Sequence, residues 1–484
     1  MLVALDAWLS RLIPYEGIIY WIFFANYLIA IAMVVSEIVH SRTSQGSIAW
    51  ILSLLILPFP MTLLYAVFGL KLFDDYAAIQ THSGRVLRKV RAAKTKILDQ
   101  PSTEEWPVLA NVSQIPFLKG NDVELLIDGE KTFASIFEGI SQAQEVLLVQ
   151  FYIIHDDELG REFADRLIER ANAGVRVYLL YDDVGCFWLP RAYKERLRRA
   201  GIKMHGFNHR HRFLRFLGPT RIQYRNHRKI VVADGKEAWI GGLNVGDEYM
   251  GRSKRFGPWR DTHVRIKGPA VLAADLSFRE DWQWATGEEL TGLPTSTAVE
   301  GDQSVLIMPT GPADVLESCA IAFDDVIGQS KERLWIVSPY FVPDTSMETA
   351  LYAAAMRGVD VRILIPEKPD HRIVWLASIA HAFRMITHGI SVYRYPGGFL
   401  HQKVILVDDR IAGVGTVNFD NRSFRINFEI TLWFTHERMV EDVEKMLRKD
   451  FAAAKKVDLD KRGARPNPFM RFLTEAARLF SPIL

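Results

Sequence analysis

The stretch HRKIVVAD, His227 to Asp234, returns as HQKVILVD, His401 to Asp408, at a spacing of 174 residues between the two histidines. Each copy places an imidazole and a primary amine two residues apart, directly ahead of an apolar run. Side chains at positions i and i+2 of a strand share a face, so the histidine and the lysine of each copy are predicted to point the same way. One such pair is usually an ordinary surface pair, but a repeated one calls for a common purpose.

The chain around each copy follows one plan that is used twice. The first half reads EVLLVQFYIIHDDELG, REFADRLIERANAG and VRVYLLYDD, and the second reads ERLWIVSPYFVPDTSM, ETALYAAAMRG and VDVRILIPEKPD. This alternation of strand-like and helix-like segments, which begins near residue 121, predicts an α/β fold. We expect two pseudo-symmetric α-β-α domains, 121–290 and 291–465, whose equivalent edges share one active-site cleft. A polar, turn-rich joint near 286–304 would separate them.

The Asp-Gly pair that ends the first copy is typical of a two-residue hairpin turn. With such a loop, His227 lies opposite Gly242, and Asn244 is next along the same face. His227, Lys229 and Asn244 are therefore predicted to converge.

The second copy gives the same arrangement, with His401 opposite Thr416 and with Lys403 and Asn418 beside it. The aspartates that complete the two motifs fall in the turns, off that face. They are therefore predicted to be structural or outer-shell groups: Asp234 and Asp408.

Two such faces brought together offer two imidazoles, two ammonium groups and two amides, which together suit a phosphate. The lysines neutralise its oxygens and the amides donate hydrogen bonds to them. A neutral imidazole can attack phosphorus, and a protonated one can give a proton to the departing oxygen. No metal is needed for charge balance, and no cofactor is implied.

The doubled pattern H-x-K-x₄-D followed by G-[GST]-x-N resembles the phospholipase D superfamily, over most of residues 121–460. The superfamily often has serine where this chain has Gly242 and Thr416, and a glycine has no side chain with which to bind phosphate. The N-terminal hydrophobic hairpin, the stretch SPYFVPD at 338–344 and the apolar C-terminus extend the resemblance to bacterial cardiolipin synthases.

This resemblance implies a ping-pong transfer of a phosphatidyl group between two phosphatidylglycerol molecules, through a phosphohistidine. It makes His227 the nucleophile and His401 the acid and base, although the similarity of the two motifs allows the reverse. Acidic residues at similar places in the family bond to the imidazoles, which implies that Asp261 and Glu429 orient the histidines. A hydrolase of phospholipid or nucleic acid, and a non-catalytic membrane scaffold, are the alternatives. The completeness of the second motif argues against the scaffold.

Two apolar segments, 18–35 and 48–70, predict a membrane hairpin within residues 1–75, because a spanning helix needs about 20 such residues. Pro58 and Pro60 should kink the second segment or make it re-entrant. A basic linker, 76–120, follows, with the acid-free run RVLRKVRAAKTK. The positive-inside rule then predicts a multi-pass protein of the bacterial cytoplasmic (inner) membrane with its catalytic domains on the cytoplasmic side.

Basic and apolar residues alternate over 203–229, which suits an anionic phospholipid such as phosphatidylglycerol or cardiolipin. Nucleic acid would suit the same residues, but the membrane anchor favours lipid. The tail 466–484 is amphipathic and could lie in the membrane interface, dock on the protein or pair with another subunit; a homodimer is predicted. The net charge is only +2, and the two cysteines, Cys186 and Cys319, are expected to be free buried thiols.

Overall fold

The computed structural model describes residues 15–39, 44–69, 76, 79, 97–208, 223–296, 298–314, 316–458 and 467–484. The chain divides into two units, one of Met1–Phe73 with Arg210–Gln223 and the other of Asp74–His209 with Tyr224–Leu484. The basic run 85–96 and most of the basic, aromatic stretch predicted to hold lipid lie outside the described residues.

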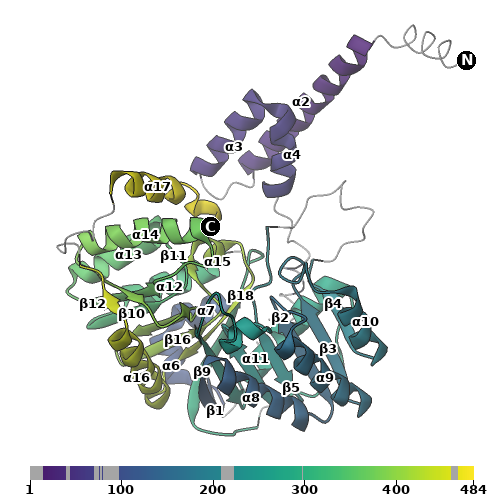
Figure 1. Ribbon diagram of the computed structural model, residues 1–484, viewed down its shortest axis with the longest axis vertical. Helices are drawn as coiled ribbons and strands as arrows, with labels where there is room; N and C mark the ends of the chain where they lie inside the picture. The colour runs from purple at the N-terminus through teal and green to yellow at the C-terminus, as the bar shows by residue number, and fades with distance from the viewer. Residues whose placement is uncertain are drawn as a thin grey trace, which may run out of the picture. The chain divides into compact units, whose positions relative to one another are not determined.

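Three apolar helices form the described part of the first unit (Figure 1): α2 (Tyr15–Val39), α3 (Ser44–Ile56) and α4 (Pro58–Phe68). Within α2, Gly17–Val39 is long and apolar enough to cross a membrane. The second predicted segment is not one continuous helix. It breaks at Leu57, because Pro58 begins a new helix, and the two pieces have 13 and 11 residues.

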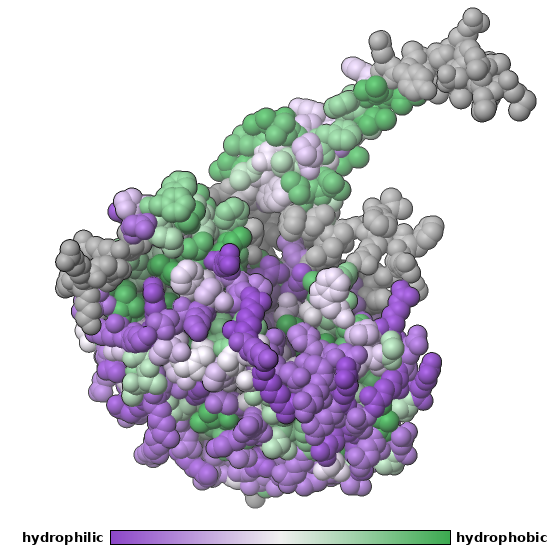
Figure 2. Space-filling model, viewed as in Figure 1, coloured by the Kyte–Doolittle hydropathy of each residue, from purple (hydrophilic) through white to green (hydrophobic). Residues whose placement is uncertain are grey.

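Buried polar side chains tie these three helices together. Glu37 on α2 accepts hydrogen bonds from Ser47 on α3 at 2.7 Å and from Tyr65 on α4 at 2.8 Å. Thr62 donates to Asn26 at 2.9 Å. Large apolar side chains of α2 point outward instead, and Figure 2 shows this hydrophobic surface over α2, α3 and α4. Such an inside-out helix group is typical of protein in lipid.

One mixed sheet of 15 strands runs through the second unit's described residues, in the order β19-β13-β12-β10-β15-β16-β18-β9-β1-β8-β6-β5-β2-β3-β4. The first repeat contributes β1 (Leu118–Ile127), β2 (Val146–Phe151), β3 (Arg176–Tyr181), β4 (Lys203–Gly206), β5 (Ile230–Ala233), β6 (Glu237–Gly241) and β8 (Thr262–Lys267). The second contributes β9 (Gln303–Thr310), β10 (Arg333–Val337), β12 (Asp360–Pro366), β13 (Ser391–Tyr395), β15 (Val404–Val407), β16 (Ile411–Gly415) and β18 (Glu429–Phe434), and β19 (Lys455–Lys456) extends its edge.

The strand order is symmetric about the pair β1 and β9. Moving outward from that pair, β8, β6, β5, β2, β3 and β4 on one side match β18, β16, β15, β10, β12 and β13 on the other. Because β1 and β9 are hydrogen-bonded to each other, the two repeats form one continuous sheet and not two separate domains. The second repeat begins with β9 at Gln303 and not at 291.

Helices cover both faces of the sheet, so the strands are apolar on both sides, as in buried sheets generally. The first repeat carries α8 (Asp128–Gln142), α9 (Glu158–Asn172), α10 (Arg191–Arg199) and α11 (Val271–Thr286); the second carries α12 (Ser318–Gly328), α13 (Thr345–Met356), α14 (Arg372–Thr387) and α16 (Glu437–Ala453). In β2, Leu147 and Val149 join the core beneath α8 and α9. Gln150, the next residue along β2, donates to Asp281 on α11 at 2.8 Å.

The end of the predicted linker 76–120 belongs to the folded unit. Residues 97–117 include α6 (Gln100–Glu105) and α7 (Pro107–Ser113). Trp106, Leu109 and Phe117 are buried in the core of the second repeat. These apolar residues fix the end of the predicted linker to the folded unit.

The C-terminal helix α17 (Pro468–Arg478) packs on α14 through the face opposite to its aromatic residues. Ala477 and Thr474 are buried, whereas Phe469 and Phe472 are 69% and 68% exposed. The patch over α17 in Figure 2 is correspondingly hydrophobic. The tail therefore docks on the protein while its apolar face stays uncovered.

Candidate active site

Each motif histidine is held in place by backbone from the other repeat. Asn226 forms a parallel bridge with Phe428, and the amide of His227 donates to the Phe428 carbonyl at 2.8 Å. In the second copy, β14 (Phe399–Leu400) pairs in parallel with β7 (Trp259–Arg260). The amide of His401 donates to the Arg260 carbonyl, also at 2.8 Å. In both copies, therefore, the backbone of the histidine is hydrogen-bonded to the backbone of the other repeat.

The carboxylates that meet the histidines are exchanged as well. His227 Nδ1 lies 2.9 and 3.1 Å from the two carboxylate oxygens of Glu429, and His401 Nδ1 lies 2.6 Å from Asp261 Oδ2. The family resemblance predicts these two acids beside histidines. It does not indicate that each acid contacts the histidine of the other repeat. An Nδ1–H that donates to a carboxylate leaves Nε2 as the nitrogen available for chemistry.

The two acids have different neighbours. Glu429 accepts hydrogen bonds from the Thr416 hydroxyl at 2.5 Å and from Asn427 Nδ2 at 3.1 Å. Asp261 accepts one from the amide of Thr262 at 2.8 Å. A Cβ at Gly242 would lie 2.1 Å from the Asp261 carboxylate, so that position has room only for glycine. Gly242, which has no side chain that could bind phosphate, thus leaves space for the Asp261 carboxylate.

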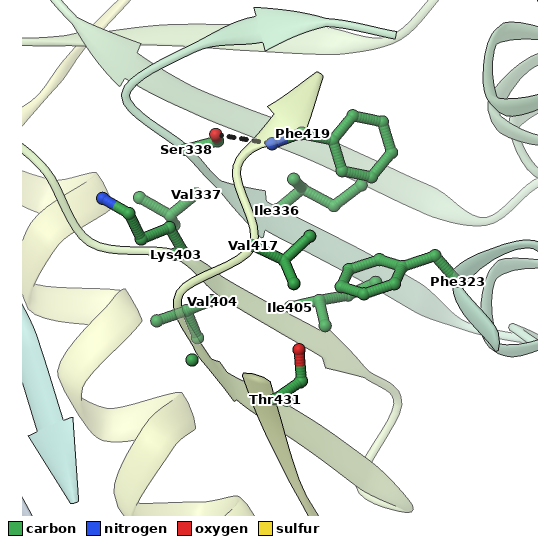
Figure 3. A pocket seen from close by; sticks show the side chains of 12 residues that line it. Phe323, Ile336, Val337, Ser338, Lys403, Val404, Ile405, Val417, Phe419 and Thr431 are labelled. Atoms are coloured by element: carbon green, nitrogen blue, oxygen red, sulfur yellow. Dashed lines mark hydrogen bonds between the residues drawn. The ribbon is translucent and has the colours of Figure 1, made fainter. Parts of the chain in front are cut away.

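Both motif lysines are buried and bend back toward their own histidines. Lys229 Nζ donates to the His227 carbonyl at 2.6 Å, and Lys403 Nζ donates to the His401 carbonyl. Figure 3 shows Lys403 at the edge of a small apolar void, with its ammonium pointing away from Phe323. Packing the alkyl stem this way directs the charge toward the histidine.

A cavity of about 580 Å³ unites the two half-sites, since His227, His401, Asn244 and Asn418 all line it. The Asn418 side-chain oxygen is buried and has no hydrogen-bond partner within the part of the chain that the structure describes. Asn244, in contrast, accepts from the Ile153 amide and donates to the Tyr249 hydroxyl, both at 3.1 Å. Asn418 is therefore the freer of the two amides for a ligand.

Burial sets the charge state of this site. It lowers the pKa of both histidines to about 4, so both imidazoles are neutral at neutral pH. It also lowers the pKa of Lys403 to about 8 and that of Lys229 well below its usual value. Burial alone would raise the pKa of Asp261 and Glu429, but the adjoining histidines and lysines hold both carboxyls below their usual values. A bound anion would reverse the depression at the histidines and lysines.

The motif aspartates lie away from the cavity, in the turns. Asp234 accepts backbone hydrogen bonds from residues 144, 145 and 146 at 2.8–2.9 Å, and Asp408 accepts from residues 331, 332 and 333. Each therefore fixes the start of a neighbouring strand, and the geometry gives neither a catalytic role.

The hairpin register is one residue from the predicted one. Ala233 pairs with Glu237, so the loop has three residues, and Val407 pairs likewise with Ile411. His227 is thus not directly opposite Gly242, nor His401 opposite Thr416. The motif aspartate that begins each loop has a left-handed backbone, with φ of 52° at Asp234 and 53° at Asp408.

Sequence reasoning missed the residue between histidine and lysine in each motif. Arg228 is fully buried, and its guanidinium bonds Asp281 on α11 at 2.8 Å and the Glu429 carbonyl at 3.0 Å. Gln402 donates to Asp450 on α16 at 2.8 Å. Both anchor the motif to the helix that ends its repeat. The only indication in the sequence is that a polar residue stands at each of these two positions, close to a buried strand.

The repeated α/β plan and the crossed histidine pair define a phospholipase D-like enzyme, and comparison with known proteins agrees. The family model "Cardiolipin synthase, PLD-like domain" matches residues 136–258 and 323–451. Cardiolipin synthase A of Pseudomonas putida (strain W619) is 42% identical over 473 residues, which cover 95% of this chain and 97% of that protein. Cardiolipin synthase A of Pseudomonas fluorescens (strain SBW25) is 43% identical over 457 residues, 92% of this chain and 94% of its own.

The chain belongs to the cardiolipin synthase family, which makes it an enzyme of the phosphatidyltransferase class. Among solved structures, phosphatidylserine synthase of Haemophilus influenzae Rd KW20 superposes with a TM-score of 0.60 at 17% identity, over 78% of this chain and 99% of that chain. That likeness concerns the fold. The predicted family and the predicted α/β fold class are confirmed.

Proposed function

We propose that the protein is a membrane-bound cardiolipin synthase. It transfers a phosphatidyl group from one phosphatidylglycerol to another through a phosphohistidine and releases glycerol. The observation that supports this most is that two histidines, each oriented by the other repeat's acid, line one cavity. A single orientable imidazole would suffice for binding; a pair suits nucleophilic attack combined with proton transfer.

In the first step, His227 Nε2 attacks the phosphorus of the donor lipid. An N–P bond forms, the P–O bond to glycerol breaks, and protonated His401 gives its proton to the departing oxygen. The phosphodiester anion supplies the negative charge that raises the pKa of His401 when the cavity is filled. Glu429 then faces a positively charged phosphoimidazole and stabilises it through Nδ1–H.

In the second step, the terminal hydroxyl of another phosphatidylglycerol attacks the same phosphorus. Its proton passes to His401, an O–P bond forms, and the N–P bond to His227 breaks. The histidines return to their starting charges and cardiolipin leaves. Lys229, Lys403 and Asn418 surround the phosphoryl oxygens and stabilise the charge that develops on them.

Purified protein incubated with phosphatidylglycerol alone tests the proposal. Cardiolipin and glycerol in equal amounts are expected. Phosphatidic acid without cardiolipin would mean a hydrolase, and no turnover would mean a scaffold. His227→Asn should abolish the covalent intermediate that acid-quenched protein otherwise carries, and peptide mass spectrometry should find the phosphoryl group at His227. A label at His401 would reverse the two roles.

We infer that α2 spans the bacterial inner membrane and that α3 and α4 enter it again as a broken segment. The catalytic repeats would then face the cytoplasm, on the side of the basic run that follows residue 84. Reaction of single cysteines placed at Ser44 and Ser102 with an impermeant thiol reagent in intact cells tests this topology. Neither residue should react before lysis if both face inward.

Anionic phospholipid, and not nucleic acid, is the proposed substrate, because an apolar helix of 23 residues precedes the catalytic repeats. A homodimer stays a prediction. Native mass spectrometry from detergent measures it, and a monomer that makes cardiolipin at full rate would contradict it.

A further inference from the structure

Two arginines line the cavity on the His227 side: Arg225 and Arg422. Arg225 precedes His227 by two residues, and its carbonyl accepts the amide of Phe428 at 2.8 Å. Arg422 lies in α15 (Asn421–Arg425), and its carbonyl accepts the amide of Asn427 at 2.9 Å. The two guanidinium groups therefore stand on the backbone segments that exchange hydrogen bonds around His227.

The two cations are close to each other and to the proposed nucleophile. Burial and the like charge of Arg225 both lower the pKa of Arg422. Arg225 Nη1 is buried and meets no hydrogen-bond partner among the residues described. The charges of both arginines act to lower the pKa of the Tyr152 hydroxyl. The Tyr152 ring centroid is 5.0 Å from that of the His227 ring. Asp182 and Asp420 are near enough to offset part of the repulsion between these like charges, and a phosphate that joins both guanidinium groups would offset more of it.

The other half of the cavity has no such pair. The repeat offset of 174 that carries His227 to His401 carries Arg225 to Phe399 and Glu248 to Arg422. The counterparts on the His401 side are thus an aromatic ring, 5.9 Å from the His401 ring, and a carboxylate that lines the cavity. Among the residues described, the arginine that lines the cavity on the His401 side is Arg255, which stacks on Phe256 beside Phe399, so a pair of arginines stands beside His227 alone.

We propose that Arg225 and Arg422 bind the phosphodiester of the second lipid, the acceptor, while the first phosphoryl group is on His227. The inference rests on the proposed function, since only an acceptor that carries its own phosphate needs such a subsite. Cardiolipin has two phosphodiesters joined by one glycerol, so its second phosphate must lie next to the reacting one. A pair of planar guanidinium groups suits it, because arginine can bind phosphate oxygens through two parallel hydrogen bonds.

Two reactions of the same enzyme separate this role from general damage. Exchange of labelled glycerol into phosphatidylglycerol needs only formation of the phosphohistidine and its reversal. Cardiolipin formation also needs the phosphate-bearing acceptor. The readout is the ratio of cardiolipin formation to glycerol exchange in mixed micelles, for Arg225→Gln, Arg422→Gln and the double variant. Arg252→Gln, an exposed arginine paired with Asp247 outside the cavity, is the matched control.

We expect the ratio to fall about ten-fold in each single variant, the effect of losing one charged hydrogen bond, and further in the double variant. Arg225→Lys and Arg422→Lys should recover part of it, and Arg252→Gln should leave it unchanged. An unchanged ratio in the glutamine variants, or an equal fall of both reactions in folded protein, overturns the subsite. A wild-type enzyme that exchanges glycerol but makes no cardiolipin overturns the proposed function instead.

Discussion

The two halves of the catalytic cavity share a backbone but differ in side chains. On one side His227 meets Glu429, which also binds a threonine hydroxyl and an asparagine amide. On the other, His401 meets Asp261, whose neighbour at position 242 is a glycine. The longer acid has three side-chain partners and the shorter acid fills the space that a Cβ would take. Equivalent positions in a repeat can therefore hold groups with different tasks.

This difference gives each histidine its own environment although burial affects both alike. The His227 side adds two arginines and the Tyr152 ring. The His401 side adds Trp259, whose ring centroid is 5.1 Å from the imidazole. A cationic side suits a covalent phosphoryl intermediate, and an aromatic side suits a group that only carries a proton. The comparison makes four predictions.

The largest effect is expected from removing either imidazole. His227→Ala and His401→Ala should each lower cardiolipin formation at least about 10³-fold, because one removes the nucleophile and the other the proton donor. Only His227→Ala should abolish labelling of the protein by labelled lipid at long incubation times, whereas His401→Ala should slow the labelling, because His401 protonates the departing glycerol in the same step. A variant of either kind that keeps full activity would rule out the two-histidine mechanism.

Exchanging the acids for amides should have the next largest effect. Glu429→Gln and Asp261→Asn should each reduce turnover about 10- to 100-fold, as expected when a partner that orients a reactive imidazole is lost. Both variants should slow formation of the phosphohistidine in a single turnover, because both histidines act in that step. The crossed hydrogen bonds predict that Glu429→Gln shifts the ring ¹⁵N resonances of His227; pairing within each repeat would instead make Asp261→Asn the variant that shifts them.

The pH dependence of the free enzyme follows from burial. Because burial lowers the pKa of both histidines to about 4, the neutral nucleophile persists far below pH 6.5. The rate at which diethyl pyrocarbonate modifies His227 in the lipid-free enzyme, where only the neutral imidazole reacts, should therefore hold its value down to about pH 5 and fall about ten-fold per pH unit only below about pH 4. kcat/KM should fall above about pH 8, as Lys403 loses its charge. An acidic limb centred near pH 6.5 would mean that the imidazoles are solvated.

The smallest effect concerns the groups behind the acids. Thr416→Val removes a hydrogen bond to a buried carboxylate and should reduce activity about three- to ten-fold, with a loss of about 1–3 kcal/mol in unfolding free energy. Gly242→Ala forces a methyl group against Asp261 and should reduce activity more than Thr416→Val does. Thermal melts beside rate measurements separate the two effects. If Thr416→Val and Gly242→Ala reduced activity equally, the proposed difference between the two half-sites would be contradicted.

The doubled motif predicted much of this site from sequence, because spacing within a motif reports side chains on one short backbone segment. It predicted both histidines and both lysines at the site, the family resemblance predicted the two acids, and the strand–helix alternation predicted the α/β repeats. It missed the exchange of acids, since the contact between His227 and Glu429 joins residues 202 positions apart. Periodicity carries no information about which of two similar repeats supplies a partner.

The errors have local physical causes. The two-residue hairpin was wrong because an Asp-Gly pair is compatible with loops of more than one length, and the sequence does not show that the Asp234 carboxylate accepts the amides of a neighbouring strand. The predicted linker 76–120 includes residues 97–117, which pack into the second repeat. Its large buried side chains, such as Trp106 and Phe117, are widely spaced, and a short apolar segment has the same sequence pattern whether it is exposed or buried. The helix break before Pro58 was one of two outcomes that the prolines allowed.

Strand β18 lies between β9 and β16 and is the last long strand that the chain contributes to the sheet. Glu429 begins it, so the first repeat leaves the ribosome with a histidine whose acid has not yet been made. A truncated or half-translated chain cannot fix that imidazole in its reactive form. Under the proposed mechanism, formation of the phosphohistidine therefore waits until the second repeat has been almost completely translated.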